Sequence, residues 1–247
     1  MKTGLFNIGR YILFMKGLFL KPEKISVYLR QIKLEMMDIG YGSLGISVLI
    51  SVFMGAVLTI QTVHNLVSPL IPIYVVAEVT RDAIILEFSP TVVCLVLAGK
   101  VGSSIASQLG TMRVTEQIDA LEIMGINSSG YLVLPKIIAA ILILPFLIVI
   151  TMFVGIAGGW AAGSITGLIN SHEFKRGLLD AFIPYNVTFA LIKSVVFAFT
   201  ITSVSAYHGF YTQGGALEVG QSSTKAVVYS SVLILFLDYV LTQLLLI

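Results

Sequence analysis

One long apolar run decides the fold: residues Tyr131–Leu168, which read YLVLPKIIAAILILPFLIVITMFVGIAGGWAAGSITGL. Lys136 is the single charged residue in this run. A helix crosses the hydrocarbon core of a bilayer, roughly 30 Å thick, with about 20 apolar residues. As one helix this run would be roughly 57 Å long. The sequence therefore predicts either a helix that breaks near Pro145 or two short spans in a tight hairpin.

The rest of the chain shares this apolar character. Of its 247 residues, 57% are hydrophobic and 11% are charged, and the mean hydropathy is +0.96. A soluble domain carries about 25% charged residues, so a soluble core is excluded. The net charge of +2 is too small and too scattered to indicate nucleic-acid binding. The composition predicts an all-α membrane protein.

Four further runs are long enough to form membrane spans: Ile39–Leu66, Ala83–Leu109, Val187–Phe210 and Ala226–Ile247. Residues Gly4–Leu20 are also apolar, but Arg10 and Lys16 interrupt them, so we expect an amphipathic helix in the membrane interface. Glu23–Met37 continues as a charged helical elbow. We thus predict one domain over 1–247, with the interfacial helix and elbow in 1–37 and a bundle of five transmembrane helices in 38–247.

Charge placement predicts the orientation. With five spans and a cytoplasmic N-terminus, only Arg81, Lys175 and Arg176 lie outside, and Lys193 lies within a span. The other basic residues then face the cytoplasm, as the positive-inside rule requires. Small residues also recur at four-residue intervals, which predicts close helix packing: Gly155, Gly159, Gly163 and Gly167, and likewise Gly102, Ala106 and Gly110.

A polar stretch follows the second span, within Ala98–Ile126 (AGKVGSSIASQLGTMRVTEQIDALEIMGI). As a helix, Met112–Met124 would place Val114, Ile118 and Leu121 on one face and Glu116, Asp119 and Glu122 on another. Gly125 stands where the helix would stop. A short amphipathic helix between two spans suits a coupling element, whose acidic flank docks on a soluble partner. The alternative is a solvated surface helix without a partner.

The same stretch closely resembles the signature of the MlaE/YrbE permease family. The residues that match the family pattern are Ala98, Gly99, Gly102, Ser103, Gly110, Met112, Arg113, Thr115, Glu116, Gln117, Glu122 and Met124. Segments around Leu86–Pro90, Ile192–Phe197 and Ala226–Thr242 are also similar to the family. The chain departs from the pattern at Gln108, where an acidic residue is usual, and at Leu86, where an Arg commonly precedes the glutamate. Arg81 is the nearest substitute for that Arg.

The resemblance implies the permease subunit of an ABC transporter in the bacterial inner membrane, a homodimer that moves phospholipids or similar lipids between the inner and outer membranes. It implies a separate ATPase subunit that binds ATP and Mg, a periplasmic MCE-domain ring and, in some assemblies, a STAS-domain protein. Coupling to the ATPase is assigned to Arg113, Glu116, Gln117, Asp119 and Glu122. The chain has no GxxxxGK[ST] phosphate loop, so we expect no enzyme activity and no cofactor in this chain.

Three of the charged residues within predicted spans stand out, because a charge at mid-bilayer costs at least about 2.5 kcal/mol: Glu87, Lys193 and Asp238. Lys193 and Asp238 lie at similar depths with opposite signs, so we expect them to pair, either as a structural ion pair or beside the lipid path. Glu87 is predicted to be a lone carboxylate at the outer mouth. Together with Phe88, it is assigned to the substrate path.

One face of the first span carries the remaining candidates for the substrate path: Val52, Ala56, Thr59, Ile60 and Val63. Their three- and four-residue spacing predicts a single helical stripe that contacts acyl chains. Ordinary helix packing explains the same spacing equally well. The resemblance supports the first interpretation, because the first and last spans border the central pocket in this family.

Two other functions compete with an ATP-driven permease. An ion-coupled secondary transporter of a hydrophobic substrate usually has two similar halves, and the sequence shows no internal repeat. A membrane enzyme acting on lipids needs a nucleophile with a base, or a metal cluster. The scattered histidines and acids predict neither of these, and no metal site is expected.

Overall fold

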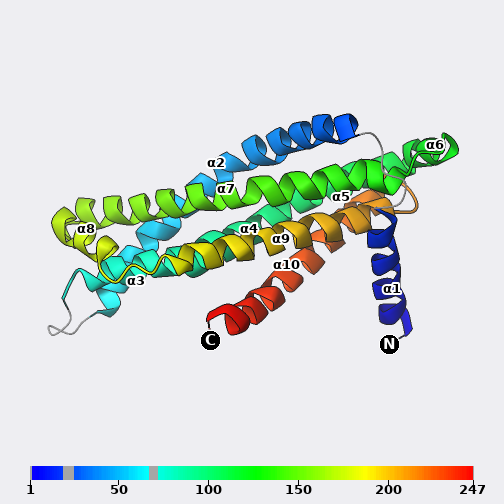
Figure 1. Cartoon of the computed structure of the whole chain (residues 1–247). Helices are drawn as coiled ribbons and strands as arrows, with labels where there is room; N and C mark the ends of the chain where they lie inside the picture. Colours follow the sequence, from blue (N-terminus) through cyan, green and yellow to red (C-terminus); the bar gives the residue numbers. More distant parts are fainter. Residues whose placement is uncertain (1, 19–24, 67–71, 247) are drawn as a thin grey trace. The chain divides into compact units, whose positions relative to one another are not determined.

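The computed structural model describes residues 2–18, 25–66 and 72–246, and these residues contain helices but no strands (Figure 1). Five helical stretches are long and apolar enough to cross a membrane, as predicted: α2 (Ile25–Asn65), the stretch Val75–Val114, α7 (Ser128–Ile165), α9 (Tyr185–Phe210) and α10 (Ala216–Leu246). The stretch Val75–Val114 consists of α3 (Val75–Ala83), the π-helical segment η1 (Ile84–Val92), α4 (Val93–Leu97), the π-helical segment η2 (Ala98–Gly102) and α5 (Ser103–Val114). The shorter helices are α1 (Lys2–Gly17), α6 (Gln117–Ile123) and α8 (Ser171–Leu179).

The long apolar run forms one uninterrupted helix, α7, so both the hairpin and the break near Pro145 are wrong. Apolar residues flank Pro145 on both sides, and no neighbouring Gly, Asn, Asp or Ser reinforces its tendency to form a turn. Transmembrane helices tolerate proline, because neighbouring groups can satisfy the freed carbonyl. The chain turns instead at Gly167, whose φ of +68° is in the left-handed region that favours glycine.

Two other predicted boundaries also shift. The described part of the elbow, Ile25–Met37, is continuous with the first span, because both belong to α2. The last helix begins at Ala216 rather than Ala226. Glu218 accepts a hydrogen bond from the Gly215 N–H, at 2.7 Å, and thereby satisfies a backbone donor at the start of α10.

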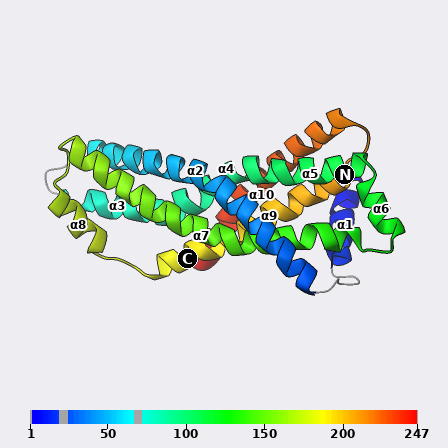
Figure 2. The ribbon, with the colours of Figure 1, turned by 90° about the horizontal axis from the view of Figure 1, so that it is seen from above.

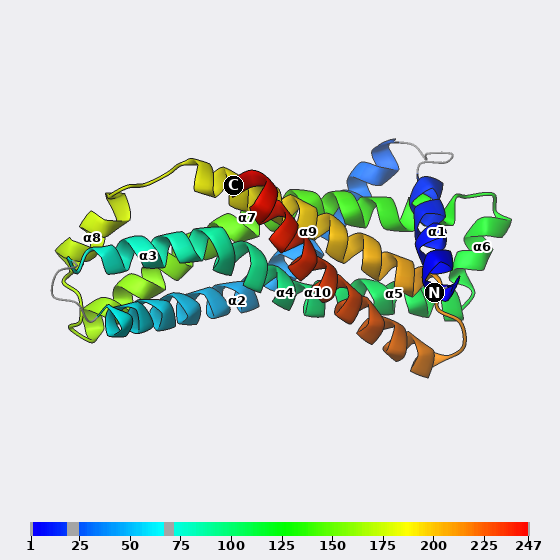
Figure 3. The same cartoon turned by 90° about the horizontal axis from the view of Figure 1, so that it is seen from below.

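The chain forms two compact units, each built from three segments: the first from Met1–Gly42, Leu97–Ile143 and Val196–Leu237, and the second from Ser43–Val96, Leu144–Val195 and Asp238–Ile247. In the first unit, α1 packs on the C-terminal end of α9, as Figure 3 shows. The buried ring of Phe14 lies 5.3–5.9 Å from the rings of Tyr207, Phe210 and Tyr211. Aromatic contacts of this kind add to the stability that burial provides.

The single charge of the long apolar run is paired within the first unit. The buried Lys136 ammonium donates to Glu35 and, at 2.7 Å, to the side-chain oxygen of Gln108. Gln108 is the position where the family usually has an acidic residue. Because Glu35 supplies the negative charge here, a neutral amide at 108 completes the set of hydrogen bonds without adding a second buried carboxylate.

In the second unit, glycines allow α2 and α7 to pack backbone against backbone. A Cβ on Gly55 would lie 1.8 Å from the carbonyl oxygen of Gly155, and one on Gly159 would lie 2.5 Å from the hydroxyl of Thr59. These contacts agree with the close packing predicted from the small residues at four-residue intervals, Gly155–Gly167. Gly167 is the exception, because a Cβ there would meet nothing within 4 Å.

At one end of the second unit, α3 and α8 lie side by side (Figures 1 and 2). Val76 and Ala77 of α3 form a small core with Phe174 of α8. The buried Arg81 guanidinium fixes the end of α8. Its Nη1 donates to the carbonyl oxygens of Gly177, Leu178 and Asp180, at 3.2, 2.9 and 2.7 Å.

Candidate functional site

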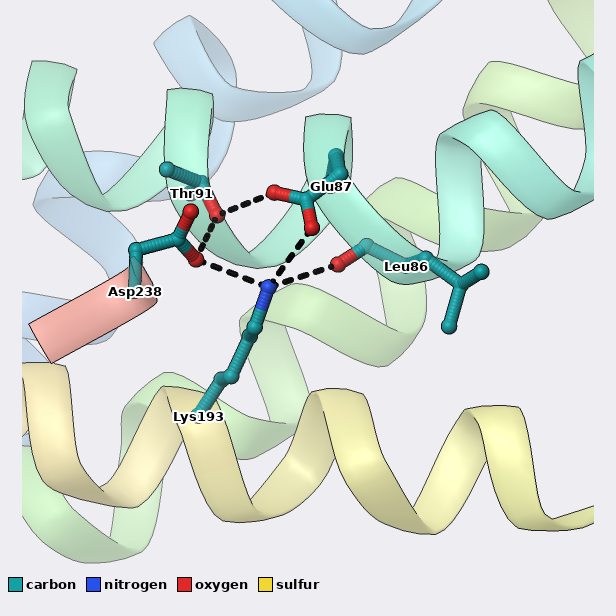
Figure 4. A network of polar contacts seen from close by, with 5 residues as sticks. All are labelled: Leu86, Glu87, Thr91, Lys193 and Asp238. Atoms are coloured by element: carbon teal, nitrogen blue, oxygen red, sulfur yellow. Dashed lines mark hydrogen bonds and ion pairs between the residues drawn. The ribbon is translucent and has the colours of Figure 1, made fainter. Parts of the chain in front are cut away.

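A polar network surrounds the fully buried side chain of Lys193 in the second unit (Figure 4). The ammonium lies 2.7 Å from Oδ1 of Asp238 and 2.8 Å from Oε1 of Glu87. It also donates to the carbonyl oxygen of Leu86 at 3.2 Å. The predicted partners Lys193 and Asp238 are therefore brought together, with Glu87 as a second carboxylate.

Thr91 joins the two carboxylates. Its hydroxyl lies 2.8 Å from Oδ1 of Asp238 and 3.3 Å from Oε2 of Glu87, as the dashed lines in Figure 4 show. One lysine between two carboxylates gives the site a net charge of −1 if all three are ionised. A buried ammonium with three oxygen partners can be accommodated in an apolar bundle, whereas an unpaired one costs several kcal/mol.

Local backbone geometry places Glu87 and Thr91 on the same side of their helix. Both lie in η1, four residues apart, and Pro90 between them has no N–H to donate. Turns of π-helix are uncommon and occur often at functional sites. η1 therefore presents the Glu87 carboxylate and the Leu86 carbonyl to Lys193, and the Thr91 hydroxyl to the two carboxylates.

This geometry corrects two expectations. Glu87 is not a lone carboxylate, because Lys193 pairs with it, although 44% of the Glu87 side chain is exposed. Arg81 does not substitute for the Arg that commonly precedes the glutamate in the family, because its guanidinium binds Asp82 and the carbonyls at the end of α8. Lys193 is the cation beside Glu87. Phe88 follows in η1 and is partly buried.

The predicted coupling segment has a different shape from the expected single helix. α5 ends at Val114, and Glu116 adopts the left-handed conformation, with φ 60° and ψ 13°, before α6 begins at Gln117. Non-glycine residues rarely adopt this conformation. α6 ends at Ile123, and Gly125, the predicted stop, is the left-handed residue just past the helix end. The Ile126 N–H bonds to the Leu121 carbonyl and the Gly125 N–H to the Glu122 carbonyl, which is the Schellman arrangement.

The acidic flank of the segment is not free. Asp119 pairs with Arg113 at 2.7 Å, and Glu122 accepts a hydrogen bond from Ser128 at 2.8 Å. Of the predicted coupling residues, Glu116 and Gln117 are exposed and form no side-chain hydrogen bond or ion pair with the described residues. The contacts differ from the prediction because the helix breaks at Glu116. The residues after the break therefore do not occupy the angular positions that one continuous helix would give them.

An apolar surface instead extends from the end of α6. Ile123 is 87% exposed and Met124 is 65% exposed, and Glu122 beside them is also exposed. On the opposite side of α6, Ile118 is fully buried and holds the helix against the first unit. The segment is therefore anchored by one face and presents large apolar side chains on the other.

The residues of the predicted stripe on the first span are partly buried in the helix bundle and partly exposed. Thr59 is fully buried, donates to the Gly55 carbonyl at 3.0 Å and packs on Gly159. Val63 packs against the core of α3 and α8. Helix packing thus explains Thr59 and Val63. Val52 and Ile60 are exposed, and Ala56 is partly buried.

A set of residues that shares only Ile60 with the predicted stripe forms the exposed apolar face of α2: Leu49, Phe53, Val57 and Ile60. Sequence periodicity could not separate this set from the predicted stripe, because both repeat at three- and four-residue steps. The glycines of α7 were the missing signal, since they identify the face of α2 that is covered. Within the described residues, no group of three or more His, Cys, Asp or Glu side chains could hold a metal ion.

Comparison with known proteins identifies the family. Residues 32–244 match the model of the family described as Permease MlaE. The chain is 36% identical to a "Probable ABC transporter permease protein" of Rickettsia bellii, over 96% of this chain and 92% of that protein. A probable ABC transporter permease protein of Synechocystis sp. is also 36% identical, over 87% of this chain and 82% of its own length.

A plant protein is also similar. "Protein TRIGALACTOSYLDIACYLGLYCEROL 1, chloroplastic" of Arabidopsis thaliana is 36% identical, over 91% of this chain and 64% of that protein. The match of the family model over most of the chain agrees with the five apolar helices of a multi-pass membrane protein. The chain therefore belongs to the MlaE family of ABC transporter permeases.

Proposed function

We propose that this chain is the membrane subunit of an ABC transporter that moves phospholipids, or similar lipids, between the inner and outer membranes. It lies in the bacterial inner membrane as a homodimer with its N-terminus in the cytoplasm. A separate ATPase subunit supplies the energy, and a periplasmic MCE-domain ring receives or delivers the lipid. A STAS-domain protein is a further partner.

The exposed end of α6 is the observation that supports this proposal most strongly. Two large apolar side chains, Ile123 and Met124, project beside charged residues from a segment whose other face is buried. Exposed apolar groups rimmed by polar ones are typical of protein interaction sites. An ATPase that grips this surface can transmit force to the first unit, because Ile118 and the Arg113–Asp119 pair fix the segment.

A lipid as cargo is supported by two observations. The name of the Arabidopsis relative refers to a glycolipid. The second unit also offers both kinds of contact that an amphiphile needs: the apolar face Leu49–Ile60 of α2 for acyl chains, and the half-exposed carboxylate of Glu87 for polar atoms. In this proposal, Lys193 and Asp238 hold Glu87 in position rather than contact the lipid themselves.

Copurification with the ATPase tests the proposed coupling surface. The double variant Ile123→Glu/Met124→Glu places charges on the exposed apolar surface without removing a buried contact. Its matched control is Leu179→Glu, which changes a residue of α8 that is 83% exposed. We expect the double variant to lose the ATPase during purification and the control to retain it. Retention by a folded double variant would refute the proposed surface.

An ion-coupled secondary transporter is the second candidate, and the Lys193 network favours it. Intramembrane networks of lysine and carboxylates can relay protons, and here one ammonium contacts two carboxylates. Transport into ATP-free vesicles separates the candidates. A proton gradient alone would drive lipid movement in the secondary transporter, whereas the proposed ABC transporter requires ATP and its ATPase.

A further inference from the structure

A cavity of about 700 Å³ lies within the first unit, between α1, the C-terminal end of α9 and the N-terminal half of α10. None of the residues that line it belongs to the Lys193 network. Its walls carry basic, aromatic and hydroxyl side chains, among them Arg10, Tyr207, Ser222, Lys225 and Tyr229. We propose that this cavity binds the phosphate group of a membrane lipid, as a site additional to the transport path.

The cavity has two cations available for an anion. Arg10 stacks over the ring of Tyr211 at 3.8 Å, and Lys225 is exposed at the rim. Neither forms an ion pair with a carboxylate among the residues that the structure describes. Glu218 also lines the cavity, but its carboxylate accepts the Gly215 N–H at 2.7 Å. The basic side chains therefore lack a negatively charged partner of their own.

The same cavity can hold the less polar parts of a lipid. Tyr207 and Tyr229 line it beside the cations, and Val204 and Leu233 supply apolar side chains. The ring of Tyr229 stacks on that of His208, with centroids 5.2 Å apart, and this contact gives the cavity a planar wall. A phosphate near Arg10 and Lys225 would leave the glycerol and the upper acyl chain against these side chains.

The surface of α1 supports a position at the depth of lipid headgroups. Phe14 and Leu18 are buried against the first unit, whereas Phe6 and Leu13 are exposed and large. A helix with apolar side chains on its outer face as well lies favourably at the membrane interface. Tyrosines concentrate at this depth, and basic pockets between membrane helices bind anionic headgroups.

Lipid binding to the purified chain, without ATP or ATPase, tests this site independently of transport. Native mass spectrometry would follow a titration with phosphatidylglycerol, and a parallel titration with inorganic phosphate would show whether free phosphate is also a ligand. The variant is Arg10→Gln/Lys225→Gln. The matched control is Lys16→Gln, which removes a charge from the same helix but does not line the cavity.

We expect the double variant to bind phosphatidylglycerol roughly a hundredfold more weakly, because it loses two charged hydrogen bonds and each is worth about tenfold, or about 1.4 kcal/mol. Lys16→Gln should bind as the unmodified chain does. Loss of phosphate binding alone would identify free phosphate, rather than lipid, as the source of the anion. Unchanged binding of both ligands, or an equal loss in Lys16→Gln, would overturn the proposal.

Folding of the variants is checked separately. Arg10 contacts Tyr211, so its replacement can loosen α1, whereas Lys225 is exposed and contributes no ion pair within the described residues. The single variant Lys225→Gln therefore provides a folded test. It should retain the melting temperature of the unmodified chain while its affinity for phosphatidylglycerol falls severalfold. Unchanged affinity in this single variant also contradicts the proposal.

Discussion

Replacement of Lys193 by Met should destabilise the second unit more than replacement of either of its carboxylate partners. The ammonium is fully buried and has three oxygen partners. Removal of one member of a buried ionic network costs about 3–5 kcal/mol, because the remaining charges lose their compensation. In Lys193→Met, Glu87 and Asp238 would both face Thr91 without a cation.

The two carboxylates should differ in their contributions. The Asp238 side chain is 18% exposed and that of Glu87 is 44% exposed. Asp238→Asn should cost about 2 kcal/mol, as expected for the loss of a charged hydrogen bond away from water. Glu87→Gln should cost less than Asp238→Asn, because Asp238 still compensates the Lys193 charge and the new amide oxygen can still accept a hydrogen bond.

Thermal unfolding of the detergent-solubilised variants measures this order. For a chain of this size, the loss in Lys193→Met corresponds to a fall in melting temperature of roughly 10 °C. The triple variant Lys193→Met/Glu87→Gln/Asp238→Asn removes every charge of the network and should recover part of the loss. If Lys193→Met melts no lower than Glu87→Gln, or if the triple variant melts below Lys193→Met, the network is not a compensated buried cluster.

Three further predictions address other parts of the chain. Gly55→Ala should lower the melting temperature, because its Cβ would lie 1.8 Å from a backbone oxygen of α7. Such overpacking costs about 1–3 kcal/mol. The control Gly45→Ala, on the same helix, should leave the melting temperature unchanged, because a Cβ there would meet nothing within 4 Å. Glu116→Gly should preserve both the left-handed turn between α5 and α6 and the melting temperature. Glu116→Val should lower the melting temperature, since a β-branched residue disfavours φ 60°. Arg81→Met should increase hydrogen exchange in α8 by removing three hydrogen bonds to its last carbonyls, and unchanged exchange would contradict that role.

Hydropathy was sufficient to identify the five long helices, because an apolar run of this length has few alternatives to a membrane span. Hydropathy did not determine their ends. α10 begins well before its apolar run, where the Glu218 side chain satisfies a backbone donor, and α7 continues through Pro145. Such boundaries depend on local hydrogen bonds and on where the chain can adopt positive φ, as at Gly167.

The charged network was predictable in part. Similar depth and opposite charge suggested that Lys193 and Asp238 meet, but depth alone does not identify a third member. Glu87 and Thr91 join them because they lie four residues apart in η1, so both side chains are on the side of the helix that meets Lys193 and Asp238. A charge swap of Lys193 and Asp238 alone would place a new carboxylate beside Glu87, so it should not restore the network.

The coupling segment shows the limit of a helical wheel. The wheel assumes one continuous helix, and the left-handed Glu116 invalidates that assumption for Asp119 and Glu122. Both acids form local contacts, while the exposed surface is formed by Ile123 and Met124. The stop at Gly125 was predictable, because glycine at this position satisfies a general requirement of helix ends.

ATP-dependent lipid transfer in reconstituted vesicles tests most directly whether this chain is a permease driven by a partner through α6. The chain would be incorporated with its ATPase and MCE-domain partner, and transfer of a labelled phospholipid would be followed after ATP is added. We predict transfer with the unmodified chain and with Leu179→Glu, and none with Ile123→Glu/Met124→Glu or without the ATPase. Equal transfer by Ile123→Glu/Met124→Glu, or transfer that persists without the ATPase, would contradict this mechanism.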